Sequence, residues 1–197
     1  MDIKQIKYVC EQMLQIKWEP KLDDAALTTL DLCDSTLEVM YFLGACHFIE
    51  GMTKKHTGTT LTIKTSTVQY GGQRYTGIWI LEPWNAWYLD ELPPEQRSGP
   101  SALLFVPQLR SSQKDITHDF GLFYGNDNGS PTWRFAHAIE VDGYGAHTER
   151  RTKDKLRDTG LDYPVLRFFE ETDKPLEWFR KVIFADAHKR MPQGRDD

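Results

Sequence analysis

The hydrophobic positions of this chain follow a helical period at its N-terminal end. In residues 2–16 the apolar side chains recur every three or four positions, which predicts an amphipathic helix. A second, short helix is predicted over residues 21–32, where the pattern is weaker. A third begins at Asp34 or Ser35, both good N-cap residues, and is expected to end near Gly51.

Beyond residue 60 the pattern changes to the two-residue alternation of strands. Residues 61–70 and 73–84 flank Gly71-Gly72, a pair typical of a hairpin turn. A proline-punctuated loop is predicted for residues 83–100. The other predicted elements are strands at 101–109, 114–125, 132–143 and 163–169, a helix at 148–159 ended by Gly160, and a last helix from Asp173. This order predicts an α/β or α+β fold around one central sheet.

The amino-acid composition indicates which class of protein and which cellular compartment to expect. The 197 residues are 40% hydrophobic and 27% charged, ordinary values for one globular domain, predicted over 1–190 with a flexible tail at 191–197. No apolar run approaches the roughly 18 residues of a membrane span, and the charged N-terminus lacks a signal-peptide core. Cys10 and Cys46 lie in apolar helical patterns, so we expect reduced core thiols and a cytoplasmic protein.

The net charge of −5 argues against a protein that coats nucleic acid without specificity, because such a protein needs a basic surface throughout. This net charge is compatible with an enzyme that binds a polyanion through one local basic patch, beside acidic groups that hold a metal ion.

The most informative segment contains the two strands at 114–125 and 132–143. If their hairpin closes on Asn128-Gly129, Asp119 lies opposite Ala138. Side chains alternate between the two faces of a strand. One face is then small and acidic, and the other is a core face that also holds His137 as a buried imidazole. The acidic face carries Asp119, Glu140 and Asp142, and the core face carries Phe120, Leu122, Phe135, Ile139 and Val141.

Three carboxylates on one face repel one another unless a cation lies between them. Hard oxygen ligands suit Mg²⁺ or Mn²⁺, so Asp119, Glu140 and Asp142 are the predicted metal ligands. The alternative is structural: Asp142-Gly143 is a common turn dipeptide, and Asp119 is then a solvated residue at the end of a strand.

The predicted helix at 148–159 is mainly cationic, with Leu156 as almost its only apolar residue. By itself it is typical of a solvated surface helix with internal salt bridges. Because it directly follows the acidic strand, both are expected at one edge of the sheet. Acidic groups for a metal beside basic groups for phosphate form the arrangement that a phosphodiesterase needs.

Three segments, residues 118–124, 138–160 and 163–168, together resemble the restriction-endonuclease-like superfamily, the PD-(D/E)xK nucleases. The closer likeness is to very-short-patch repair endonucleases and their small relatives of unknown function. It is good over 101–170 and weak over 34–52. The matching residues are Ser35 and Glu38, Gln108, Asp119-Phe120, Glu140-x-Asp142-Gly143, His147, Asp154, Arg157 and Val165–Phe168.

The resemblance implies a restriction-endonuclease-like core, a mixed central sheet flanked by helices, and Mg²⁺-dependent hydrolysis of DNA, in repair or in defence against foreign DNA. Asp119 and Glu140 are then the principal metal ligands, and Asp142 is a third ligand or orients water. Glu38 is a further acidic group, and His147 is a proton shuttle or phosphate contact. The expected nucleic-acid contacts are Arg150, Arg151, Lys153 and Gln108, whereas Asp154 and Arg157 are expected to form a structural pair.

Two departures from the family pattern matter. The family has Lys two residues after the strand Glu, where this chain has Asp142, so the water-orienting group stays open among Lys153, Lys155 and His147. Residues 53–100 form an insertion without a family counterpart. Its aromatic residues cover a core edge, bind a protein partner or second copy, or stack on unpaired bases. These aromatics are Tyr75, Trp79, Trp84, Trp87 and Tyr88.

The sequence therefore predicts a metal-dependent DNA endonuclease, with RNA as a weaker possibility for the substrate. The alternative is a non-catalytic protein of the same fold that serves as a binding or partner subunit in a larger complex. The missing Lys and the acidic balance favour that alternative.

Overall fold

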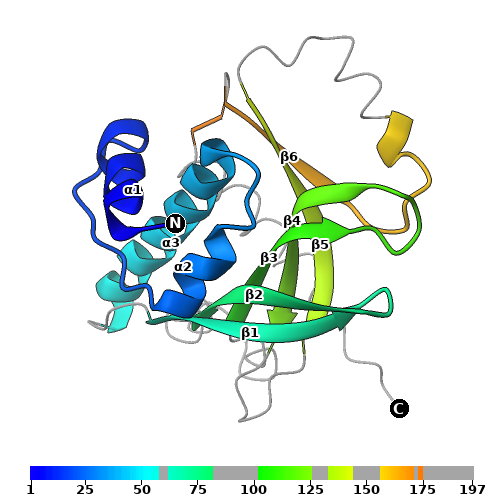
Figure 1. The fold of residues 1–197 in the computed structure, drawn as a ribbon, viewed down its shortest axis with the longest axis horizontal. Helices are drawn as coiled ribbons and strands as arrows, with labels where there is room; N and C mark the ends of the chain where they lie inside the picture. The colour runs from blue at the N-terminus through cyan, green and yellow to red at the C-terminus, as the bar shows by residue number, and fades with distance from the viewer. Residues whose placement is uncertain (58–61, 82–101, 126–132, 144–155, 171–172, 175–197) are drawn as a thin grey trace.

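The structure is a computed structural model, and it describes residues 1–57, 62–81, 102–125, 133–143, 156–170 and 173–174 (Figure 1). Within them, three helical regions cover one face of a six-stranded sheet. The mixture of helices around one central sheet confirms the predicted α/β class. No helix in this part of the chain has both the length and the apolar character needed to span a membrane.

The first two helical predictions are confirmed. Helix α1 (Ile3–Tyr8) begins at an Asp2 capping box and continues into a π-helical turn, η1 (Val9–Met13). Helix α2 (Asp24–Leu30) is shorter than expected. It begins after Asp23, whose side chain accepts a hydrogen bond from the Ala26 amide at 2.8 Å.

Helix α3 (Thr36–Thr57) crosses the sheet and begins as predicted at an N-cap Ser35, whose Oγ accepts a hydrogen bond from the Glu38 amide at 3.2 Å. The predicted end near Gly51 is wrong, because the helix continues to Thr57. Glycine ends a helix where it takes a positive φ, and Gly51 is not among the glycines that do. Its missing side chain faces open space, so the helix runs through it.

The six strands lie in the sheet in their chain order. Strands β1 to β5 pair antiparallel, and β6 pairs parallel with β5, so the sheet is mixed as predicted. The hairpin turn at Gly71-Gly72 is confirmed, with φ values of 56° and 77° that suit glycine. The strands are β1 (Thr62–Tyr70), β2 (Gln73–Leu81), β3 (Ala102–Arg110), β4 (Thr117–Gly125), β5 (Arg134–Asp142) and β6 (Val165–Phe169).

The predicted register of β4 and β5 is wrong by two residues, because Ala138 lies opposite Gly121 rather than Asp119. The turn that sets this register, including Asn128-Gly129, lies outside the described residues. An even shift keeps each side chain on its predicted face. Phe135 is the exception: the register shifts again between Leu122 and Phe123, and this irregularity turns Phe135 to the opposite face.

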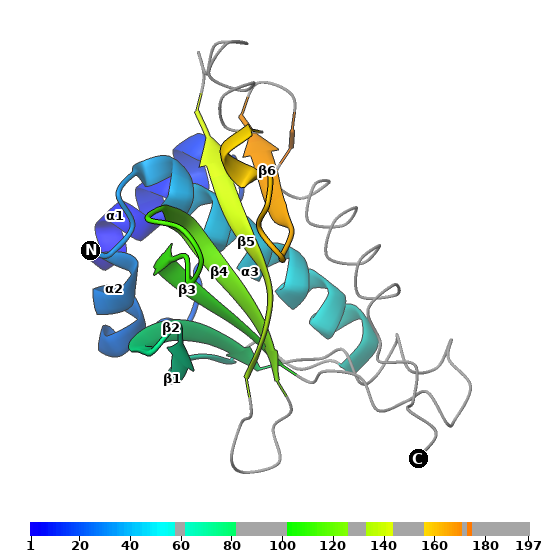
Figure 2. The same cartoon turned by 90° about the vertical axis from the view of Figure 1, so that its right-hand side faces the viewer.

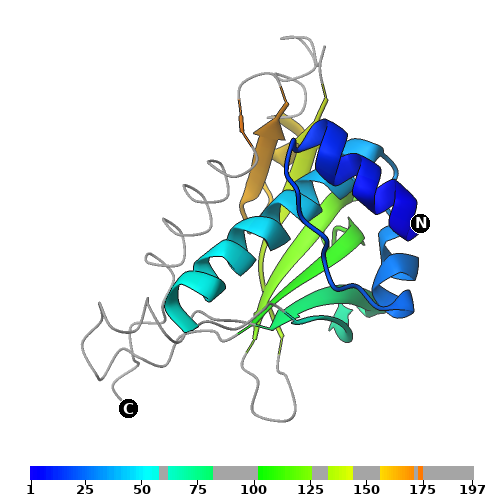
Figure 3. The same ribbon diagram turned by 90° about the vertical axis from the view of Figure 1, so that its left-hand side faces the viewer.

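Figure 3 shows the helices lying against one face of the sheet, and the main core fills the space between them. It includes four of the five residues predicted for the core face, namely Phe120, Leu122, Ile139 and Val141. His137 is fully buried, as predicted, and the observed register places it opposite Leu122. Cys10 and Cys46 are buried in this core, and all three cysteines are free.

A second apolar cluster lies on the other face of the sheet, where the sheet curls over itself. The Trp133 indole next to β5 donates to Ser66 Oγ of β1 at 3.1 Å, although three strands separate β1 from β5. Tyr70 of β1 packs on Phe135 of β5 with ring centroids 4.7 Å apart. This cluster contains Val68, Leu104, Val106, Leu109 and Phe123.

The inserted hairpin is part of this second cluster. Tyr75 and Trp79 are partly buried and pack against it, so these two aromatics cover a core edge. Trp79 also contacts Trp133 edge-on, at 5.9 Å between centroids. The predictions for Trp84, Trp87 and Tyr88, and for the last helix and the tail, lie outside the described residues.

Candidate functional site

Asp119 precedes Phe120, the last residue of β4 that pairs with β5. Its side chain contacts β5 just beyond the end of this pairing. The Val141 amide donates to Asp119 Oδ2 at 2.6 Å. Val141 stands between Glu140 and Asp142 in β5. A single hydrogen bond thus places the Asp119 carboxylate next to the residue that joins the two other predicted ligands. Figure 2 shows the strand that carries these two ligands, β5, between β4 and β6.

Glu38 reaches the same region from the first turn of α3, and this residue is 4% exposed. Its carboxylate accepts hydrogen bonds from Ser35 Oγ at 2.8 Å and from the Asp34 amide at 3.1 Å. Gln108 Nε2 of β3 donates a third, at 3.0 Å. Gln108, predicted as a nucleic-acid contact, therefore binds Glu38 within the protein.

The backbone is irregular where Gln108 and Asp119 lie. Gln108 has a φ of 53°, uncommon for a residue with a side chain. The β3–β4 pairing includes Pro107 with Phe120 and Leu109 with His118, but not Gln108 with Asp119. Such interruptions redirect side chains, and they are frequent next to functional sites.

The acidic groups of this region affect one another electrostatically. The pKa of Asp119 is raised to about 7, chiefly by burial and secondly by the negative charges of Glu140, Glu38 and Asp142, against the lowering effect of the hydrogen bond from Val141. Burial also raises the pKa of Glu38, and its three hydrogen bonds oppose that rise. Excess negative charge is therefore gathered around Asp119.

Glu140 is compensated by two neighbours. Its Oε1 lies 2.6 Å from His118 Nδ1 and 3.0 Å from Arg157 Nη2. Glu140 is 8% exposed and His118 is fully buried. A buried carboxylate needs such partners, because desolvation of an unpaired charge is costly.

His118 belongs to a longer chain of hydrogen bonds. Its Nε2 lies 3.1 Å from the Tyr163 hydroxyl, which donates to Ser111 Oγ at 2.6 Å. The Tyr70 hydroxyl from the inserted hairpin accepts from the next residue, Ser112, at 3.2 Å. The inserted hairpin therefore contacts the residue next to Ser111, which is the last member of the hydrogen-bond chain that begins at Glu140.

Asp142 is held from the neighbouring strand. Its Oδ2 accepts from Arg167 Nη1 of β6 at 3.1 Å, and Arg167 Nη2 also binds Asp158 Oδ2 at 2.8 Å. Asp158 is the last of the helical residues 156–158. A turn follows, and Gly160, the predicted stop, has a φ of 84°. Lys114 Nζ donates to the carbonyl oxygens of Arg157 and Thr159, both at 2.6 Å. These contacts fix the end of the predicted basic helix against β5.

The donor chemistry of the acidic residues fits a hard divalent cation, but the present arrangement does not form a ligand group. Within the described ranges, no three His, Cys, Asp or Glu side chains are grouped so that they would hold a metal ion. The hydrogen bonds and ion pairs of this part of the chain use one oxygen of each carboxylate: Asp119 Oδ2, Glu140 Oε1 and Asp142 Oδ2.

Several predicted site residues cannot be placed. His147, Arg150, Arg151, Lys153, Lys155 and Asp154 lie outside the described residues. The predicted pairing of Arg157 with Asp154 is therefore untested, and Arg157 binds Glu140 and Asp158.

Four residues that support these acids carry no predicted role from the sequence: His118, Tyr163, Asp158 and Arg167. His118 gave no signal, because it matches no metal-ligand spacing and its partner Glu140 is 22 residues away. Arg167 lay within the quoted Val165–Phe168 match, but no role was assigned to it. The parallel pairing of Glu140 with Arg167 explains its place in the site.

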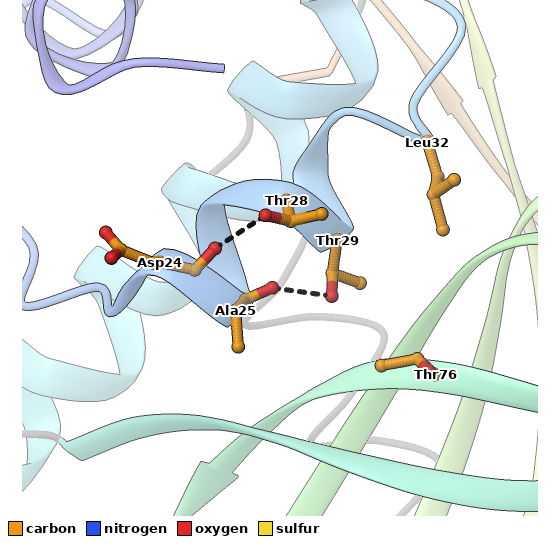
Figure 4. A pocket seen from close by; sticks show the side chains of 6 residues that line it. All are labelled: Asp24, Ala25, Thr28, Thr29, Leu32 and Thr76. Carbon is orange, nitrogen blue, oxygen red and sulfur yellow. Dashed lines mark hydrogen bonds between the residues drawn. The ribbon is translucent and has the colours of Figure 1, made fainter.

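The structure also has a hollow of about 440 Å³ between α2 and β2, far along the sheet from β6 (Figures 1 and 4). The Thr28 and Thr29 hydroxyls in its wall donate to the carbonyl oxygens of Asp24 and Ala25, both at 2.8 Å. Because these hydroxyls serve the helix itself, the hollow does not offer the convergent polar groups of a ligand site.

A comparison of the chain with protein-family models, curated proteins and solved structures finds no match.

Proposed function

We propose that this protein is a metal-dependent DNA endonuclease and that Asp119 and Glu140 hold a Mg²⁺ or Mn²⁺ ion. The observation that carries the proposal is the 2.6 Å hydrogen bond from the Val141 amide to Asp119. It brings an acid of β4 next to the two acids of β5, and Glu38 adds a fourth from α3. Carboxylates so gathered are a donor set for a hard cation.

A bound divalent ion supplies an activated water and stabilises the charge that develops on a phosphodiester. The chain's own residues prepare the site. Gln108 and Ser35 orient Glu38, and His118 holds Glu140. The basic residues predicted at 148–159 are proposed to bind phosphate, and Arg157 is the member of that segment that the structure places beside Glu140.

A specific observation favours the second candidate, a non-catalytic protein of nuclease type that binds a partner. Glu140 and Asp142 are already paired with Arg157 and Arg167. These ion pairs compensate the charges of the two carboxylates without a metal ion. Such pairing is expected in a non-catalytic protein, in which these residues only stabilise the fold.

Cleavage assays separate the two. The purified protein is incubated with supercoiled plasmid, single-stranded DNA or RNA, each with Mg²⁺, Mn²⁺ or EDTA. We expect metal-dependent cleavage of DNA that is lost in Asp119→Ala and in Glu140→Gln, a variant that keeps the shape of the side chain. Asp115→Ala is the control, because this acid is exposed and pairs only with Arg110 among the contacts described.

Circular dichroism verifies that each variant is folded. Cleavage that survives in the folded Asp119 and Glu140 variants contradicts the proposed site. Wild-type protein that cleaves no substrate with either metal supports the non-catalytic candidate.

A further inference from the structure

We infer that the face of the sheet opposite helices α1 to α3 binds an unpaired DNA strand, whose bases stack on the aromatic side chains there. We call this surface the second face, because it carries the second apolar cluster and the aromatic residues packed against it. The inference rests on the proposed function for the choice of DNA as the ligand, and it specifies the form of DNA that is bound.

Aromatic rings follow one another across the second face. Trp79 of β2 contacts Trp133 edge-on, with centroids 5.9 Å apart. Tyr70 of β1 packs on Phe135 of β5 at 4.7 Å, and Phe135 packs on Tyr163 at 5.0 Å. All five residues are neither buried nor fully exposed, so each ring packs on a neighbour and keeps part of its surface in solvent. Rings held in this way form a stacking platform for successive bases, and stacking tolerates any sequence because every base has a π face.

The row of rings ends at the candidate site. The Tyr163 hydroxyl lies 3.1 Å from His118 Nε2, and His118 Nδ1 lies 2.6 Å from Glu140 Oε1. A strand stacked along the row is therefore directed toward Glu140. This continuity favours a substrate strand over an unrelated partner as the occupant of the second face.

The charge of the second face suits a polyanion. Lys64 lies opposite Trp79 in the β1–β2 pairing, and its Nζ lies 5.9 Å from the centroid of the Trp79 ring. A cation beside a stacked base is placed to bind the adjoining phosphate. The chain has a net charge of −5, yet none of the other residues described on this face of the hairpin is acidic. By the alternation of side chains they are Ser66, Val68, Tyr70, Gln73, Tyr75 and Gly77.

Polar side chains lie among these rings. The Ser66 hydroxyl, the Gln73 amide and the Tyr75 hydroxyl are groups that proteins use to bind the sugars and phosphates of DNA. A protein partner would instead favour a continuous apolar surface at the centre of the interface. The alternation of rings with hydroxyl and amide groups therefore favours a nucleic-acid strand.

The experiment measures binding of DNA to the full chain by fluorescence anisotropy. The probes are a labelled oligo(dT) strand of about 15 nucleotides and a duplex of the same length, each at several salt concentrations. EDTA is present throughout, so that binding is measured apart from cleavage. We expect the strand to bind more tightly than the duplex.

Three variants test the surface. Trp79→Leu and Tyr75→Leu each remove one ring and keep an apolar side chain, and each is expected to raise the Kd for the strand about tenfold. Lys64→Gln removes the cation. It is expected to raise the Kd about threefold and to reduce the slope of log Kd against log salt by about 0.7, the loss of one phosphate contact on a single strand.

Two matched controls are expected to leave the Kd unchanged. Tyr8→Leu removes a ring from α1, where Tyr8 is 61% exposed. Arg74→Gln removes a positive charge from the other face of the same hairpin, where Arg74 Nη2 donates to Thr67 Oγ1 at 3.4 Å. Circular dichroism verifies that each variant is folded. If Trp79→Leu does not fold, Tyr75→Leu and the salt dependence of Lys64→Gln decide.

Wild-type protein that does not bind the strand, or that binds the duplex more tightly, overturns the inference. Folded Trp79→Leu and Tyr75→Leu variants that bind as wild type does, or controls that lose as much affinity, also overturn it. A wild-type dimer that binds no DNA and that Trp79→Leu dissociates would instead assign the second face to an interface between two copies of the chain.

The inference and the proposed function fail in different ways. Metal-dependent cleavage of plasmid by a protein that does not bind the strand contradicts the inference and leaves the proposed function intact. Binding of the strand that depends on Trp79 and Tyr75, by a protein that cleaves no substrate, supports the inference and contradicts the endonuclease.

Discussion

The Arg167 guanidinium of β6 binds the Asp142 carboxylate of β5 across the only parallel strand pair in the described sheet. The same side chain also binds Asp158, so one arginine joins two strands and the end of a helix. Antiparallel neighbours are joined by short hairpins, whereas a parallel strand returns through a long connection. Contacts such as this one therefore determine how β6 is held.

We predict that Arg167→Leu lowers the free energy of unfolding by about 3 kcal/mol, because it leaves the poorly exposed Asp142 carboxylate without its partner and removes one of the two arginines that bind Asp158. Urea denaturation followed by circular dichroism measures the change. Arg110→Leu removes an arginine from an exposed pair with Asp115 and is expected to cost less than about 0.5 kcal/mol. Similar losses in the two variants would show that the Arg167 bridge is not a special contact.

The Asp119 carboxyl predicts a pH dependence of stability. Its pKa rises from an ordinary value of 3.8 to about 7 in the folded protein, chiefly because it is buried and secondly because Glu140, Glu38 and Asp142 are near. The folded state therefore holds the Asp119 proton more tightly than the unfolded state does. This contribution to stability is fully present below pH 4 and is lost as the pH rises to about 7.

Asp119→Asn removes the charge and keeps an oxygen for the Val141 amide. We expect the variant to be more stable than wild type by up to about 4 kcal/mol at pH 8, and the difference to vanish near pH 4. Urea midpoints measured between pH 4 and pH 8 test this. A difference that stays constant over the range would mean that Asp119 ionises in the folded state as it does in water.

Much of the fold was predictable because local patterns determine it. Apolar runs, alternating in residues 61–70 and continuous in residues 101–109, located the strands, and Gly71-Gly72 located the first hairpin turn. Ser35 and Glu38 located the start of α3, since a capping pair works within one turn and needs no tertiary contact. The end of α3 was missed because a glycine stops a helix only when its backbone turns left-handed, which residue type alone does not determine.

The site was predictable only in part. Asp119, Glu140 and Asp142 were found as neighbours, although the register was wrong, because a shift of two residues preserves the face of each side chain. Their partners were missed, since Arg157 and Arg167 follow the long connection to the parallel strand β6, and His118 reaches Glu140 from β4 beyond the last paired residues of the two strands. Ion pairs between distant segments leave no periodic signal in a sequence.

The close packing of β3 on β4 gives a third prediction. A Cβ atom at Gly121 would lie 2.3 Å from Leu109 Cδ2 and 3.1 Å from Leu109 Cβ. We expect Gly121→Ala to destabilise the protein by about 2–3 kcal/mol, because the second apolar cluster must shift to admit the methyl group. Gly51→Ala is the matched control. It meets open space on α3, and it is expected to stabilise by up to about 1 kcal/mol. Thermal unfolding of both variants tests the contrast, and a Gly121→Ala variant as stable as wild type would contradict the close approach.

The hydroxyl of Tyr163 gives the last prediction, because it joins His118 to Ser111 behind Glu140. Tyr163→Phe keeps the ring that packs edge-on against Phe135, with centroids 5.0 Å apart, and removes only the oxygen. We expect a loss of about 1–2 kcal/mol in the free energy of unfolding, since the buried His118 ring then lacks a partner for Nε2. The control is Tyr75→Phe, whose hydroxyl donates to Gln73 on the exposed part of the hairpin and whose loss should cost less than about 0.5 kcal/mol. Urea denaturation of both variants measures the difference, and equal losses would show that the hydroxyl of Tyr163 does not hold His118 against Glu140.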